Sequence, residues 1–114
     1  MSQAYALIQA KAQRRAAEAA LAARERQATT EIAQAYVSLE RAMRSYEVAL
    51  VKEQIAKKAL DLVGSQYQQG SADAIRMNQA QGDYLDARVQ SVLALHDIFI
   101  DRAQYKRAVG DPLW

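Results

Sequence analysis

Apolar side chains recur every three or four residues through the middle of the chain. They alternate in steps of four and three at Ile32, Tyr36, Leu39, Met43, Tyr46 and Leu50, and again at Ala56, Leu60, Val63 and Tyr67. This is the heptad spacing of a helix that packs against another helix along one narrow seam. No proline occurs before Pro112, and Gly64 is the only glycine before Gly70. The pattern therefore predicts one long helix over about residues 5–69.

A turn is expected around Gly70. Glycine can adopt the left-handed conformation that ends many helices, and Ser71 and Asp73 carry side chains that cap the start of a new helix. A second helix is predicted over about residues 73–109, and Gly110 with the nearby Pro112 is expected to end it.

The two helices differ in length. At 1.5 Å per residue the first would be ~100 Å long and the second ~55 Å. Antiparallel pairing across a short turn would cover about residues 32–69 and leave the N-terminal third without a partner in the chain. The sequence therefore predicts an all-α fold, a long antiparallel helical hairpin or coiled coil with unequal arms.

The second helix carries two apolar stripes. The first stripe comprises Met77, Ala80, Tyr84, Ala87, Ser91, Ala94 and Ile98. The second stripe comprises Leu85, Val89, Val92, His96, Phe99 and Ala103. Two stripes suit a helix with a neighbour on each side, as in a sheet or cylinder of helices. A compact bundle in which both stripes face one core would suit the pattern equally well.

Composition agrees with long helices and excludes several function classes. Alanine makes up roughly a fifth of the 114 residues, and the formal charge is only +2, with acidic and basic residues interspersed. No run of one charge favours nucleic acid as a partner, and an alanine-rich apolar side disfavours a helix lying on a membrane surface. The chain has no cysteine, which excludes disulfides and thiolate metal sites but fits any compartment.

Candidate catalytic chemistry is sparse. His96 is the sole histidine, and Asp97, adjacent in sequence, points about 100° away around the helix. Asp97 and Asp101 share a face, but two carboxylates alone are weak evidence for a metal or an acid/base pair. No nucleophile elbow, phosphate loop, zinc spacing or dinucleotide fingerprint occurs. We expect no enzyme activity, no cofactor and no metal site.

Several short motifs resemble those of TolC-type outer membrane factors. Tyr67-Gln68-Gln69-Gly70 resembles the Y-x-x-G that closes the family's long descending periplasmic helix. Ala80-Gln81 falls where the family has D-A-Q, and the chain ends in Trp114, where the family has a G-G-G-W-like sequence. The stretch 31–39 is similar to the family's v-A-y-x-x-L segment. The order and spacing of these motifs, over nearly the whole chain, make the resemblance specific.

The resemblance implies a channel component. Outer membrane factors are trimers whose twelve helices form a periplasmic tunnel for efflux or type I secretion. We expect residues 1–114 to be a single helical hairpin segment of such a protein, in the periplasm as part of an outer membrane channel. The implied partners are a periplasmic adaptor (membrane fusion) protein and the rest of the outer membrane factor. The alternative is a coiled-coil interaction or oligomerisation module, such as an adaptor-type hairpin, unrelated to a channel.

The resemblance also implies two sets of functional residues. The expected adaptor-docking tip consists of Gln68, Gln69, Gly70, Ser71, Ala72 and Asp73. The expected lining of the tunnel entrance consists of Arg76 and Gln79, at positions where relatives often carry the two aspartates of an L-D-V-L-D-A-Q motif. Loss of both acids predicts an open or anion-tolerant entrance in place of an acidic gate.

Overall fold

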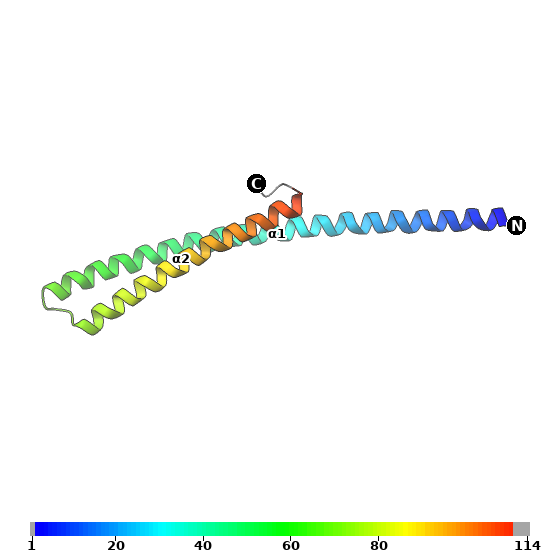
Figure 1. Cartoon of the computed structure of the whole chain (residues 1–114). Coiled ribbons are helices and arrows are strands. Elements are labelled where there is room, and N and C mark those ends of the chain that lie inside the picture. Colours follow the sequence, from blue (N-terminus) through cyan, green and yellow to red (C-terminus); the bar gives the residue numbers. More distant parts are fainter. Residues whose placement is uncertain (1, 111–114) are drawn as a thin grey trace.

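The computed structural model describes residues 2–110, which form two helices joined by one tight turn (Figure 1). Helix α1 spans Ser2–Gln68, 67 residues, and helix α2 spans Ala74–Val109, 36 residues. The described chain contains no strand and measures 101 × 26 × 15 Å. The predicted all-α hairpin with unequal arms is confirmed. Pro112 and Trp114, which the sequence reading used, lie outside the described residues.

Helices α1 and α2 meet along one seam in which small and large residues alternate. On α2, the buried and half-buried residues of this seam begin with the predicted first stripe and continue through Asp101, Tyr105 and Ala108. Every third or fourth residue of α1 contributes in the same way, which brings the two helices together as in a coiled coil. The α1 residues of the seam are Ile32, Ala35, Leu39, Ala42, Tyr46, Ala49, Glu53, Ala56, Leu60 and Val63.

The predicted heptad of α1 is wrong at three of its ten positions. Tyr36 and Met43 are each 50% exposed and Tyr67 is 48% exposed, so none of them is buried in the seam. Alanines one residue earlier take the first two places, with Ala42 only 7% exposed. Closely packed helices need small side chains at the contact, whereas the prediction favoured the larger apolar neighbour.

Three contacts define the register of the hairpin. The rings of Tyr36 and Tyr105 lie 6.0 Å apart between centroids, beside the end of the seam away from the turn. Near the middle, the Nε of Arg88 lies 3.5 Å from Oε1 of Glu53. A Cβ added at Gly64 would lie 3.8 Å from Cε of Met77, close to the turn. Each step along α1 toward the turn is therefore matched by one step back along α2.

Two surfaces of the helices have no partner within the described chain. The segment 2–30 of α1 extends past the end of α2 and is exposed except for the half-buried Ala22 (Figure 1). The second stripe of α2 also faces solvent, since Leu85 is 62% exposed and Phe99 59%. The compact-bundle alternative is therefore wrong for this chain, because α1 covers the first stripe alone. Neither described helix has a stretch apolar enough to span a bilayer.

Candidate functional site at the hairpin tip

The predicted tip residues form the turn that reverses the chain. Gly70 has φ = 82°, the left-handed conformation expected for it. Its N–H donates to the carbonyl of Tyr67 at 3.1 Å, and the N–H of Ser71 donates to the carbonyl of Gln66 at 2.8 Å. This pair of bonds is a Schellman motif, which satisfies the last carbonyls of α1.

Asp73 begins the second arm. Its side-chain Oδ1 accepts a hydrogen bond from the backbone N–H of Arg76 at 2.9 Å, and its extended backbone is that of an N-cap. The Asp73 carboxylate therefore serves as the cap of α2. Among the other tip side chains, Gln68, Gln69 and Ser71 are exposed and Ala72 is half-buried.

Gln66 is a tip residue that the sequence reading missed. Its carbonyl accepts from the N–H groups of Ser71 and Ala72 and from the Ser71 hydroxyl, at 2.8, 3.2 and 3.1 Å. Its own side-chain Oε1 is buried and has no hydrogen-bond partner among the described residues. The position offered no motif, because any residue can supply the backbone carbonyl on which the turn closes.

Arg76 and Gln79 lie beside the seam. Both are exposed, while Met77 and Ala80, the next residue after each, pack in the seam. They border a shallow groove of about 500 Å³ near the tip, together with Lys52 of α1. The structure thus places both predicted entrance residues on one face of the hairpin, as their spacing of three residues requires.

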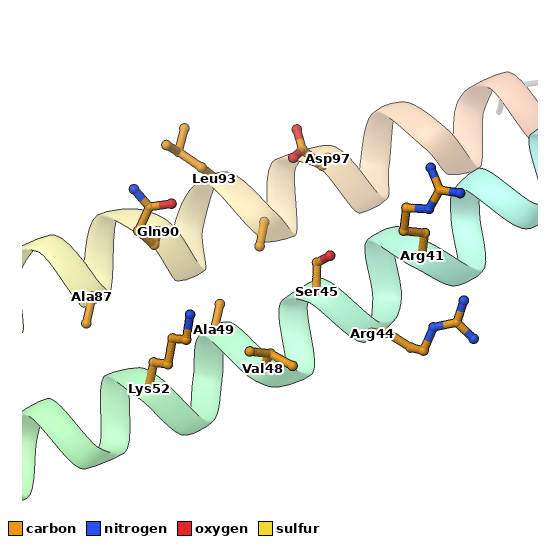
Figure 2. Close-up of a pocket in the computed structure, with 11 residues that line it drawn as sticks. Arg41, Arg44, Ser45, Val48, Ala49, Lys52, Ala87, Gln90, Leu93 and Asp97 are labelled. Atoms are coloured by element: carbon orange, nitrogen blue, oxygen red, sulfur yellow. The ribbon is translucent and has the colours of Figure 1, made fainter.

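The same face continues away from the tip as a second groove of about 790 Å³ (Figure 2). Basic side chains of α1 border it, among them Arg41 and Lys52. In Figure 2 the side chain of Lys52 points toward α2. Along α2 the border is polar and apolar in turn, with Gln90, Leu93 and Asp97. The rim of this face therefore carries both charges, whereas the groove itself is lined largely by apolar side chains such as Val48 and Leu93.

Glu40 acts on the acidity of Tyr36. The side chain of Glu40 raises the pKa of Tyr36 above its ordinary value, first by accepting a hydrogen bond from the neutral phenol and then through its negative charge. His96 is exposed in the second stripe. Among residues 2–110, no three side chains of His, Cys, Asp or Glu gather as a metal site would need.

Comparison with known proteins identifies the family. The family model described as outer membrane efflux protein matches residues 4–111. The chain belongs to the outer membrane efflux protein family. Searches of curated proteins and of solved structures gave no match. The match covers both arms of this efflux-family hairpin and its turn, so the resemblance stated from the short motifs is confirmed.

Proposed function

We propose that this efflux-family chain forms part of the periplasmic tunnel of a tripartite efflux or type I secretion system. The observation that carries the proposal is the family match over residues 4–111, which coincides with the whole hairpin. In this role residues 1–114 are one helical hairpin segment, packed beside other helices of a homotrimeric channel. A coiled-coil oligomerisation module, the alternative, would need the heptads but not the family's sequence pattern.

The tip, Gln68 to Asp73, is the proposed docking point for a periplasmic adaptor. The turn is narrow and exposed, and its short polar side chains can exchange hydrogen bonds with a second helical tip without burying charge. Gly70 adds no side chain to this surface, and no heavy atom lies within 4 Å of where its Cβ would be.

Docking is tested by site-specific photo-crosslinking in the full-length channel in cells. A crosslinking amino acid at Gln69 is expected to capture the adaptor. The matched control is Gln9, an exposed glutamine on the overhang of α1, which is expected to give no adaptor product. Equal capture from both positions, or capture from Gln9 alone, contradicts docking at the tip.

Arg76 and Gln79 are the proposed lining of the tunnel entrance. Both are exposed on the groove face of the hairpin, near the tip. In a trimer, three Arg76 side chains would approach one axis, and their mutual repulsion would keep the entrance open and favour anions.

The entrance proposal is tested by bilayer conductance of the full-length channel. Arg76→Asp combined with Gln79→Asp is expected to shift selectivity toward cations and to introduce block by divalent ions. Gln81→Asp is the control, because Gln81 is exposed near the same level but not on the groove face. If the double variant conducts like the unmodified channel, these positions do not line the entrance.

A further inference from the structure

The groove of Figure 2 has an apolar floor. Val48 and Ala49 of α1 and Leu93 and Ala94 of α2 form this floor, and the groove has a volume of about 790 Å³. This volume is within the range of sites that hold small organic molecules. The floor is therefore large enough for the apolar part of a small ligand.

The end of the groove away from the tip is charged on both sides. Arg41 and Arg44 line it from α1, and Asp97 lines it from α2. A smaller hollow of about 270 Å³ continues from it, because Arg41, Ser45 and Asp97 line both, and this hollow adds Asp101 of α2. The two arginines and the two aspartates form the charged end of the groove.

The two signs of charge lie on different helices and at matching heights. Counting from the tyrosine pair at the far end of the seam, Arg44 is level with Asp97, and Arg41 is within one residue of the level of Asp101. Within residues 2–110, none of these four side chains belongs to an ion pair. Figure 2 shows Arg41 and Asp97 apart, on the two borders of the groove. The guanidinium and carboxylate groups are therefore available to a ligand that lies between them.

This arrangement disfavours a ligand of a single charge. A carboxylate attracted by Arg44 would be repelled by Asp97 across the groove, and for an ammonium group the two forces are reversed. A molecule that carries both groups close together can pair with both borders at once. An α-amino acid head has this chemistry, because its carboxylate suits the planar donors of arginine and its ammonium group suits aspartate.

The floor determines the rest of the ligand. It extends from Arg44 to Lys52, which are separated by ~12 Å along α1, and no charged residue lines the groove between them. Val48 and Leu93 on this floor are 53% and 51% exposed. An apolar tail lying there would be stabilised by the apolar surface that it removes from water.

We propose that this groove binds amphipathic zwitterions with a free α-amino acid head and an apolar tail of ~12 Å. The head bridges the arginines of α1 and the aspartates of α2, and the tail lies on the floor toward Lys52. The site belongs to a single hairpin, and it does not depend on the proposed role in efflux.

Fluorescence titration of the full chain with Nε-dansyl-lysine tests the site, because this molecule joins an α-amino acid head through a flexible chain to an apolar fluorophore. Dansylcadaverine lacks only its carboxylate, and N-dansyl-6-aminohexanoic acid lacks only its ammonium group. The zwitterion is expected to bind at least about fivefold more tightly than either, since each of them loses one ion pair and keeps one repulsion. Equal affinities for the three probes, or binding of none of them, overturn the proposal.

Removal of one charged border is expected to exchange the preference. Arg41→Gln combined with Arg44→Gln leaves only the aspartates, so affinity for Nε-dansyl-lysine should fall about fivefold or more and dansylcadaverine should bind at least as tightly. Asp97→Asn combined with Asp101→Asn leaves only the arginines, so N-dansyl-6-aminohexanoic acid should become the preferred probe. If neither double variant changes the order of the three affinities, the groove does not recognise the head and the proposal fails.

Two controls separate the site from general charge and apolar effects. Lys57→Gln combined with Lys58→Gln removes two charges from exposed residues of α1 that line neither hollow, and it is expected to leave all three affinities unchanged. Val48→Ser alters the floor and is expected to weaken the three probes alike. Equal losses in the arginine and lysine variants, with helicity unchanged in circular dichroism, would show that net charge alone attracts the probe, which also overturns the proposal. None of these results bears on adaptor capture at Gln69 or on channel conductance, so the proposed function is judged separately.

Discussion

Gly70 and Gly82 are both exposed glycines, yet their backbone conformations differ. Gly70 has φ = 82°, a conformation that side chains with a Cβ adopt at a cost, whereas Gly82 lies within α2. The turn at Gly70 could be predicted from the local sequence. A glycine followed by capping side chains is a signal that only a few neighbouring residues determine, so tertiary packing had little opportunity to override it.

Substitution of Gly70 by Val is expected to lower the free energy of unfolding by about 1–2 kcal/mol, because valine is strained at positive φ. Gly82→Ala is the matched control and is expected to raise it by up to about 1 kcal/mol through helix propensity. No heavy atom lies within 4 Å of either added Cβ, so steric contacts contribute little to the difference in stability between the two variants. Chemical denaturation checks both values, and a stabilising Gly70→Val would show that the turn lies elsewhere.

Removal of the Asp73 cap is expected to destabilise the second arm. In Asp73→Ala the backbone N–H of Arg76 loses its acceptor at 2.9 Å, with an expected cost of about 1 kcal/mol. Asp73→Asn keeps a capping oxygen and is expected to cost only a few tenths of a kcal/mol. The two variants are compared by thermal unfolding followed at 222 nm, where equal losses would mean that the charge, and not the cap, matters.

At the scale of the helices, the first stripe of α2 could be predicted, whereas the matching stripe of α1 was predicted only in part. Two small positions of the first stripe, Ala80 and Ala87, have only polar or charged neighbours in sequence, so no larger apolar residue competes for them. On α1, Ala42 stands beside Met43, and hydrophobicity alone favours the methionine. Which neighbour enters the seam depends on how closely α2 approaches, a property of the pair of helices and not of α1 alone.

Leucine at Ala42 is therefore expected to disrupt the seam. Ala42 is 7% exposed, and a larger side chain there must push α2 away, at an expected cost of about 1–3 kcal/mol. Met43→Leu changes the adjacent, half-exposed residue and is expected to shift stability by less than about 0.5 kcal/mol. Denaturant unfolding of both variants compares these positions directly. A larger loss at Met43 would restore the heptad that the sequence suggested.

At the scale of the whole molecule, the sequence predicted the unequal arms and the overhang, because helix ends are marked by glycine and capping residues. The candidate site was less predictable. The motif order located the tip, but the groove beside Arg76 also needs Ala59 and Val63 of α1, which come to line it only when the hairpin closes. The groove therefore depends on the register of the seam, which neither helix determines separately.

The overhang, residues 2–30, is expected to open far more readily than the paired part of α1 although both are helical. Its backbone hydrogen bonds are supported by alanine propensity and by local pairs such as Arg14 with Glu18, 3.5 Å apart and exposed. In the paired part, opening a turn also breaks contacts with α2. Hydrogen exchange followed by mass spectrometry, at protein concentrations low enough to limit association, should show amides of the overhang exchanging at least about 100-fold faster than those near Ala42 and Ala49. Equal protection along the whole of α1 would mean that the overhang has a partner even in dilute solution, and that the seam is not what holds α1 together.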